Sequence, residues 1–258
     1  IKDLLSDVKQ IIDKSVKEIV ITGINVGDFG KSTGESFLNL IKDLDEVEWE
    51  GRYRISSIEP NLLSSEIISF VANSKHFSPH FHIPLQSGSD SVLKLMKRRY
   101  DTNRFKNLIE DIHNKIPECC IGIDVIVGSP GETSELFEEC YTFLQNIDFT
   151  YLHVFSYSER ENTAALNIFP KISSKEKNIR SNRLQELSEK KKMDYYRRFI
   201  GKKLSVLFES DNNKGMISGF TENYIKVEIP FDQGLVNKIV EVELLELSES
   251  GKIKLRVV

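Results

Sequence analysis

The sequence IGIDVIVGSPGET, residues 121–133, contains the pattern that decides the fold. It begins with a run of aliphatic residues interrupted only by Gly122 and Asp124, as in a strand buried on both faces of a parallel sheet. The chain then passes through Gly-Ser-Pro-Gly and continues with Glu-Thr-Ser at 132–134, which is typical of a tight loop followed by a helix N-terminus. The stretch therefore predicts a strand–loop–helix unit of an α/β protein.

Similar strand–helix units recur through the N-terminal part of the chain, with strands starting about 30 residues apart. The predicted strands are 18–25, 53–60, 80–87, 121–128 and 151–158, and the predicted helices are 35–44, 64–73, 89–97, 102–115 and 133–146. Five consecutive units favour a (βα) barrel or partial barrel over an isolated sheet. In such barrels, ligands bind at the C-terminal ends of the strands.

The pattern changes after the fifth strand. Residues 173–200 predict one long helix, which Ser173 or Ser174 can cap and which ends before Gly201. Beyond Gly201, five short alternating strands separated by turn residues predict a small antiparallel β-barrel. We therefore expect a partial barrel over 1–172, a basic connecting helix over 173–200 and a β-barrel over 201–258.

The composition is that of a folded protein. Of the 258 residues, 40% are hydrophobic and 29% charged, which supports a packed core and argues against disorder. The apolar runs are shorter than the roughly 18 to 20 residues that span a bilayer, and no signal peptide opens the chain. We therefore expect no membrane association, and the missing initiator methionine indicates a fragment or a processed product.

The cysteines indicate a reducing, cytoplasmic location. There are three, Cys119, Cys120 and Cys140, and an odd number with an adjacent pair is a poor disulfide framework. Their spacing matches neither a zinc site nor an iron–sulfur loop.

Charge is unevenly distributed. The formal net charge is −4, but residues 171–203 contain twelve lysines and arginines against four acidic residues, a local charge of +8. Such a block is typical either of a polyanion-binding surface or of a solvated helix face, and the sequence leaves both interpretations open.

Two carboxylates indicate a ligand site. Asp124 lies within a buried strand and Glu59 at the end of another, and an unpaired buried carboxylate is energetically costly. Each could bind hydroxyl or amino groups of a ligand, and Asp124 should then lie within hydrogen-bond reach of polar groups such as Gln86 or His153. Alternatively, each could pair with an arginine. The candidate arginines are Arg52, Arg54, Arg98 and Arg99.

Two other patterns do not match a metal site or a dinucleotide-binding site. His80, His82 and His153 suggest metal binding, but no further ligand has a diagnostic spacing, so we predict no metal site. The segment GINVGDFG, residues 23–30, differs from the dinucleotide-binding fingerprint, since no helix starts directly on it.

Taken in order, five segments resemble the radical S-adenosylmethionine (SAM) methylthiotransferases: EIVITGINVGDFG, RISSIEP, HIPLQSGSDSVLKLMKRRY, IDVIVGSPGET and YLHVFSYSERENTAA. The resemblance covers nearly the whole chain, with a TRAM-like barrel from residue 201. The segments GINVGDFG, KLMKRRY and YLHVFSYS are most similar to the branch that modifies threonylcarbamoyladenosine beside the tRNA anticodon. Sister branches modify isopentenyladenosine in tRNA or an aspartate of a ribosomal protein.

The resemblance implies a chemistry that this chain cannot perform alone. In the family, a [4Fe–4S] cluster held by a CxxxCxxC loop reduces SAM to a radical that takes hydrogen from carbon 2 of adenine. A second [4Fe–4S] cluster supplies sulfur and a second SAM supplies the methyl group. CxxxCxxC and the second-cluster domain are absent here, so we expect neither cluster in this chain and no activity by itself.

The implied partners of the complete enzyme are an electron donor and the tRNA anticodon stem-loop. The alternative is a stand-alone RNA-binding protein whose barrel is not catalytic. A CxxxCxxC motif encoded shortly upstream would distinguish the two.

The resemblance also assigns residues. The SAM-binding candidates are Gly23, Asn25, Glu59, Gln86, Ser87, Asp124, Gly128, His153, Phe155 and Tyr157. The RNA-binding candidates are Arg98, Arg99, Lys190, Lys191, Lys192, Arg197, Arg198 and Lys202. We further expect Tyr195 and Tyr196 to stack on bases and the basic helix to present one open cationic face.

Overall fold

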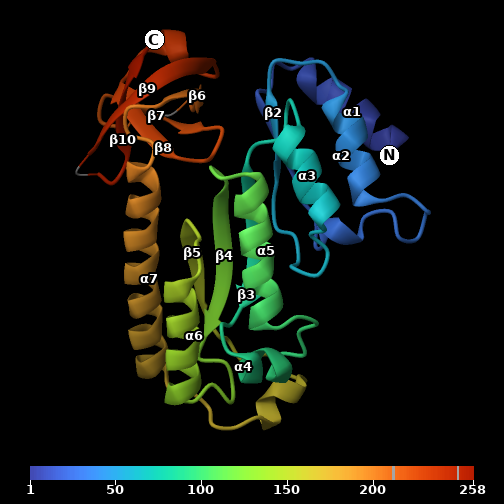
Figure 1. Cartoon of the computed structure of the whole chain (residues 1–258), viewed down its shortest axis with the longest axis vertical. Helices are drawn as coiled ribbons and strands as arrows, with labels where there is room; N and C mark the ends of the chain where they lie inside the picture. The colour runs from blue at the N-terminus through green and yellow to red at the C-terminus, as the bar shows by residue number, and fades with distance from the viewer. Residues whose placement is uncertain (211–212, 249) are drawn as a thin grey trace.

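The N-terminal part alternates strands and helices in a computed structural model that describes residues 1–210, 213–248 and 250–258 (Figure 1). Its elements are α1 (Lys2–Ile12), β1 (Glu18–Ile21), η1 (Val26–Asp28), α2 (Phe37–Asp45), β2 (Arg52–Ile55), α3 (Ser65–Asn73), β3 (His80–Gln86), α4 (Asp90–Leu95), α5 (Thr102–Lys115), β4 (Cys120–Val127), α6 (Ser134–Asn146), β5 (Tyr151–Ser156) and η2 (Ala164–Asn167). Each of the ten predicted strands and helices of this part is present.

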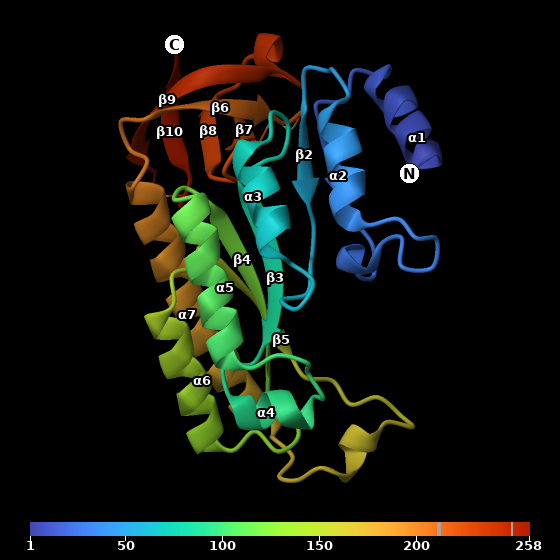
Figure 2. The same ribbon diagram turned by 45° about the vertical axis from the view of Figure 1, so that its right-hand side comes forward.

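The strands form an arc of parallel pairs. β1 pairs with β2, and β3, β4 and β5 form a second sheet in that order. Isolated bridges from Tyr53 to Phe77 and from Ser57 to His82 connect β2 to the β3 side. Helices cover the outside of the arc, with α3 against α5 and α6 against α7 (Figure 2). The partial (βα) barrel predicted from the sequence is thereby confirmed.

The first two strands are shorter than predicted. β1 ends at Ile21 and β2 at Ile55, whereas the apolar patterns continue to residues 25 and 60. After Ile55 the chain leaves β1 and contacts β3 only locally, as where the Ile58 amide donates to the His82 carbonyl at 3.0 Å. Local hydrophobicity cannot show that the neighbouring strand diverges.

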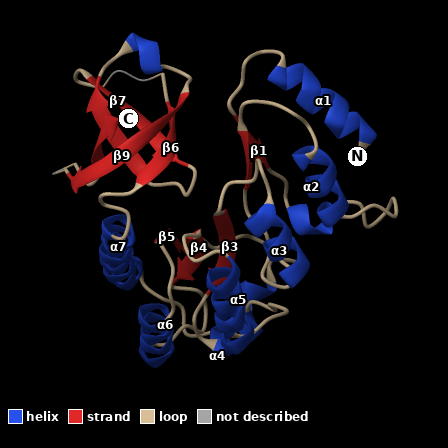
Figure 3. Cartoon of the chain, turned by 45° about the horizontal axis from the view of Figure 1, so that its top comes forward, coloured by secondary structure: helices blue, strands red, loops and turns tan. Residues whose placement is uncertain are grey.

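A long helix and a closed β-barrel complete the chain. The elements are α7 (Ser174–Arg197), β6 (Lys203–Phe208), β7 (Met216–Thr221), β8 (Lys226–Pro230), η3 (Gln233–Leu235), β9 (Ile239–Leu247) and β10 (Ile253–Val257). The barrel closes in the order β10-β8-β7-β6-β9, and Figure 3 shows its strands gathered beyond one end of α7. Its β8–β10 pair is parallel, so the prediction of a wholly antiparallel barrel was wrong at the closing pair. Residues 211, 212 and 249 of the predicted barrel region lie outside the described residues.

Helix α7 belongs to two hydrophobic cores. Leu184 and Leu187 pack into the core of the parallel strands, whereas Tyr195, Tyr196 and Phe199 pack into that of the β-barrel. The helix therefore fixes the β-barrel beside the N-terminal ends of β3, β4 and β5 (Figure 1). In the described ranges, no helix is both long and apolar enough to cross a membrane.

Candidate functional site

A cavity of about 500 Å³ lies between the parallel strands and the β-barrel. One wall comes from the inner faces of β2 to β5, and the other from the end of α7 and from β7, β8 and their connection. The first wall includes Arg54, Ser56, Ser57, His82, Asp124, Tyr151, His153 and Phe155, and the second includes Lys192, Tyr196, Phe220, Tyr224 and Lys226. Cationic and aromatic side chains thus dominate this surface.

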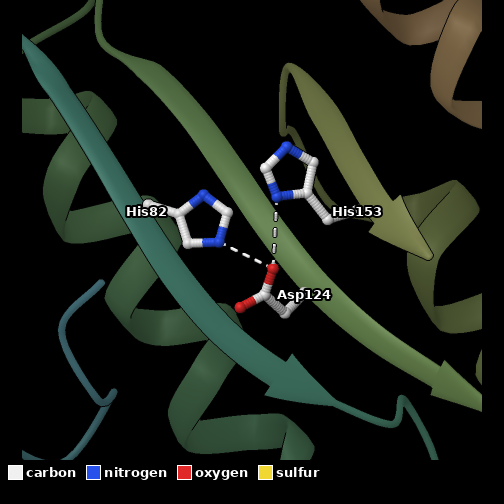
Figure 4. Close-up of side chains that lie close together, drawn as sticks. All are labelled: His82, Asp124 and His153. Atoms are coloured by element: carbon white, nitrogen blue, oxygen red, sulfur yellow. Dashed lines mark hydrogen bonds and ion pairs between the residues drawn. The ribbon is translucent and has the colours of Figure 1, made fainter. Parts of the chain in front are cut away.

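Three side chains of neighbouring strands meet in this cavity (Figure 4). The Nε2 atom of His82 lies 2.7 Å from Oδ1 of Asp124, and Nδ1 of His153 lies 3.4 Å from the same oxygen. The sheet register explains the cluster, because Asp124 lies directly opposite His153 on β5 and beside Pro84 on β3, two residues beyond His82. Residues two apart on a strand share a face.

The two imidazoles explain why β4 carries an aspartate. Burial alone would raise the pKa of Asp124, but hydrogen bonds from His153 and His82 lower it to about 2. The carboxylate is therefore charged throughout the neutral range. The expected contact with His153 is present, but His82 takes the place expected for Gln86. None of the four candidate arginines pairs with Asp124 among the described residues.

The cluster also offers metal ligands, which corrects the reasoning from sequence. Asp124 supplies the further ligand that the sequence spacing did not reveal, and the ligand atoms of His82, Asp124 and His153 lie within 4.8 Å of one another. His80 is outside the cluster because it is buried, with its Nε2 3.0 Å from the Tyr151 hydroxyl. Two histidines and one carboxylate are typical of zinc or non-haem iron sites.

The surroundings of the cluster favour a hydrogen-bonded triad over a metal site. Metal-binding histidines almost always donate their second ring nitrogen to a protein acceptor. Within the part of the chain that the structure describes, His82 Nδ1 and His153 Nε2 have no such partner. The prediction that this protein has no metal site therefore stays a prediction, now for a different reason.

The SAM-binding candidates separate into two groups. The cavity group comprises Asp124, His153 and Phe155. The rim group, Gly23, Asn25, Glu59, Gln86, Gly128 and Tyr157, lies at or just beyond the C-terminal ends of the strands. Ser87 belongs to neither, because it is fully buried and its hydroxyl accepts a hydrogen bond from the Ser89 amide at 3.2 Å.

Arg98 lies in the rim, beside Gln86 and Glu59. Its Nη2 atom donates to Oε1 of Gln86 at 3.1 Å, and its Nη1 atom lies 3.7 Å from Oε1 of Glu59. The alternative of a Glu59–arginine pair is therefore realised. The neighbouring Arg99 is exposed.

Helix α7 holds the loop that follows β4. The Gly128 amide donates to Oε2 of Glu132 at 2.6 Å, and Nη1 of Arg180 donates to the same oxygen and to the Glu132 carbonyl, both at 2.8 Å. Lys177 donates to the Tyr157 carbonyl at 2.8 Å, so α7 also holds the chain beyond β5. Sequence reasoning missed this role of α7, because only the fold brings these residues together.

Gly128 is expected to resist substitution more than another glycine in a similar conformation. Its φ is +73°, and an added Cβ would lie 2.3 Å from Cγ of Lys177. Gly34 has a φ of +77° but open space around it. Alanine in the left-handed region costs roughly 1 to 2 kcal/mol, so Gly34→Ala should lose about that much in urea unfolding and Gly128→Ala clearly more. Equal losses would show that Lys177 moves aside freely.

The basic residues of α7 do not form the open cationic face that was predicted. The Lys191 ammonium donates to the carbonyls of Gln145 and Ile147 at the end of α6. The remaining pairs are Lys192 with Glu189, Arg197 with Asp194, Arg198 with Asp148, and Lys202 with Glu118. Lys190 is exposed, with no carboxylate within ion-pair distance in the described ranges. Most of these cations are paired with carboxylates of α7 itself and of neighbouring segments, which explains why no open cationic face forms.

Tyr195 and Tyr196 are not available for stacking on bases. Both are buried in the core of the β-barrel. The Tyr195 hydroxyl donates to the carbonyls of Glu118 and Asn223, and the Tyr196 hydroxyl accepts from the Lys226 amide. Their role is to join α7 to the barrel.

The cysteines do not fit an iron–sulfur cluster. All three are buried, and burial raises the pKa of Cys120 and Cys140 to about 12 and that of Cys119 well above its ordinary value. Cys119 packs in the core of the parallel strands and Cys120 in that of the β-barrel. Among the residues described, the three thiols do not converge on one site, as the ligands of an iron–sulfur cluster do.

Comparison with known proteins gives a consistent result. Residues 1–144, more than half of the chain, match the model of the radical SAM superfamily. The threonylcarbamoyladenosine tRNA methylthiotransferase of Bacillus subtilis (strain 168) is 36% identical over 251 residues, which cover 95% of this chain and 56% of that protein. The protein of the same name from Thermotoga maritima is 35% identical, covering 96% and 56%.

A relative with a different name is slightly less similar. The tRNA-2-methylthio-N(6)-dimethylallyladenosine synthase of Natranaerobius thermophilus is 32% identical, and the match covers 92% of this chain and 54% of that protein. The chain thus spans about half the length of the curated relatives it matches.

Proposed function

This chain belongs to the radical SAM superfamily, and from that premise we propose that it is the SAM-barrel and RNA-binding part of a tRNA methylthiotransferase acting on threonylcarbamoyladenosine. The observation that carries the proposal is similarity of 34–36% identity to relatives of that name across 88% or more of the chain. Those matches extend beyond residues 1–144 into α7 and the β-barrel. The relative named for dimethylallyladenosine is less similar, at 32%.

The rim group would hold SAM. Glu59 and Gln86 supply side-chain oxygens that can accept hydrogen bonds from the amino group of its methionine part. The left-handed glycines of the loop after β4, at 128 and 131, let Lys177 and Leu95 pack closely against the backbone and so fix the loop beside the proposed ligand. The electron for reductive cleavage of SAM would come from a [4Fe–4S] cluster. This chain does not provide the ligands of that cluster.

For RNA contact we propose residues 173–258, comprising the connecting helix (173–200) and the β-barrel (201–258), beside a SAM domain formed by residues 1–172. Lys190 and Arg99 are the predicted RNA-binding cations that stay exposed without a carboxylate partner in the described part of the chain. Phosphate contacts of such cations would make tRNA binding salt-dependent. The proposed partners are the tRNA anticodon stem-loop and an electron donor, in the cytoplasm.

The test uses the full-length protein that contains this chain, reconstituted with iron, sulfide, SAM and a reductant. Supplied with tRNA containing threonylcarbamoyladenosine, it should form the 2-methylthio derivative, detected by mass spectrometry of the nucleosides. Modification of dimethylallyladenosine instead would assign the chain to the sister branch. RNA binding without any modification would support the stand-alone RNA-binding protein.

A further inference from the structure

We propose that the cavity between β2–β5 and the β-barrel recognises the anionic N6 substituent of the substrate adenosine. The inference rests on the proposed function and names the part of the molecule that selects the substrate. A threonylcarbamoyl group carries a carboxylate, amide groups and a hydroxyl, whereas a dimethylallyl group is apolar. The two therefore demand opposite kinds of pocket.

Two cations in the cavity have unused capacity to bind an anion. Arg54 donates through Nε to Glu18 at 3.3 Å, but its terminal nitrogens have no acceptor in the described ranges. The Lys226 ammonium lies over the Phe220 ring at 5.1 Å and has no carboxylate within ion-pair distance in residues 1–210, 213–248 and 250–258. A ligand carboxylate entering the cavity would find both cations in its lining, Arg54 on the wall of parallel strands and Lys226 on the β-barrel wall.

The Arg54 guanidinium is held in place by its neighbours. It lies 4.6 Å from the centre of the Tyr224 ring, which in turn stacks on Phe220 at 4.5 Å with an interplanar angle of 15°. Arg52 shares Glu18 with Arg54, since its Nε atom donates to the other carboxylate oxygen at 2.8 Å. A preorganised cation loses little freedom on binding, which favours affinity.

The triad of His82, Asp124 and His153 can bind the uncharged polar groups of the ligand beside these cations. The charged Asp124 repels a carboxylate but accepts hydrogen bonds from amide or hydroxyl donors. His153 is 54% exposed, and its Nε2 atom is available to the carbamoyl group. The ligand carboxylate would therefore lie towards Arg54 and Lys226, with the carbamoyl and hydroxyl groups near the triad.

Strand β5 connects this cavity with the proposed SAM site. His153, Phe155 and Tyr157 follow one another at alternate positions, and His153 and Tyr157 are about 13 Å apart at roughly 3.3 Å per residue. Phe155 is 52% exposed in the cavity wall, where its ring can stack on a purine. An adenosine whose purine stacks on Phe155 would direct its N6 substituent into the cavity. The purine itself would lie on the side nearer the rim.

An apolar substituent would be rejected on physical grounds. Placed against these cations, a dimethylallyl group would displace water from them and return no hydrogen bond. Sites built to bind a polar group discriminate strongly against analogues that lack it, because their own polar groups are left unpaired. The cavity should therefore select for charge at the end of the N6 substituent.

The experiment measures nucleoside binding to this chain by isothermal titration calorimetry. The probes are N6-threonylcarbamoyladenosine, its terminal carboxamide, which lacks only the negative charge, and N6-dimethylallyladenosine. We expect the carboxylate form to bind at least tenfold more tightly than either other probe. Lys226→Gln and, separately, Arg54→Gln should each remove most of that preference, while Lys203→Gln, on the exposed start of β6, should leave it intact.

Circular dichroism of each variant shows whether it is folded, and the Lys226 variant keeps the test decisive if Arg54→Gln unfolds. Equal binding of the acid and its carboxamide would overturn the inference, while the proposed function would stand if the full-length enzyme still modifies threonylcarbamoyladenosine. Preferential binding of the dimethylallyl probe would count against both. Tight, Asp124-dependent binding of Co(II) would also overturn it, because the triad would then be a metal site.

Discussion

Replacement of Arg180 by methionine is expected to lower the free energy of unfolding by about 3 to 5 kcal/mol, because it leaves the buried Glu132 carboxylate without its counter-ion. Arg180 is 2% exposed and Glu132 1% exposed. Burial already raises the pKa of Glu132, and the Gly128 amide and Arg180 only partly oppose this effect. Methionine keeps much of the packing against Phe137 but none of the charge.

Urea unfolding of Arg180→Met and of a matched control measures this effect. The control is Arg183→Met, three residues further along the same helix, which removes an exposed ion pair with Glu138. Such surface pairs contribute about 0 to 1 kcal/mol. The double variant Arg180→Met/Glu132→Gln should recover a large part of the loss, because no charge is then left buried. Similar losses for the two single arginine variants would contradict the buried-charge explanation.

The same substitution should also weaken SAM binding. Glu132 accepts the Gly128 amide, so loss of Arg180 frees the loop that we propose as part of the SAM site. A SAM titration of the full-length variant, at a urea concentration where it remains folded, would separate this positioning effect from unfolding. Unchanged SAM affinity would restrict Arg180 to a structural role.

Asp124→Asn is expected to lower the stability by about 2 kcal/mol at neutral pH. The folded-state pKa of about 2 lies below the ordinary value of 3.8, and a shift of this size corresponds to about 2 kcal/mol. Because the folded pKa is depressed, this stability is fully present above pH 4 and is lost as pH falls towards 2. The wild type and the variant should therefore converge in acid.

Unfolding free energies measured between pH 2 and pH 7 test this expectation. Asp7→Asn, at an exposed position of α1, is the matched control and should stay within about 0.5 kcal/mol of the wild type. A stability difference for Asp124→Asn that does not shrink in acid would show that its histidine contacts do not depend on the aspartate charge. A loss much larger than 2 kcal/mol would indicate that the triad is mainly structural.

The repeat of strands and helices was predictable because its signals are local. Asp101 caps α5 and Thr133 caps α6 through hydrogen bonds to amides three residues further on, as such residues do in short segments. The aliphatic run at 121–127 forms the central strand of its sheet, and the resemblance to radical SAM proteins is confirmed by the family match over residues 1–144.

The candidate site was only partly predictable. Asp124 was recognised because a carboxylate in an aliphatic strand needs a partner, and that partner was expected among arginines or at Gln86 and His153. His82 was considered only as a possible metal ligand together with His80 and His153, and nothing in the sequence pairs residues 82 and 124. Arg54 was considered only as an ion-pair partner, and Lys226 was not considered, although both line the same cavity.

The sequence by itself determined the order and type of the elements and the chemistry available at each strand end, because hydrophobic period, capping and turn residues act over a few positions. Only the tertiary structure decided which charges meet. Arg180 reaches Glu132 across 48 positions and Lys202 reaches Glu118 across 84, so the apparent basic block of α7 is largely neutralised. Such pairings depend on strand register and on helix packing, which set distances between residues that are remote along the chain.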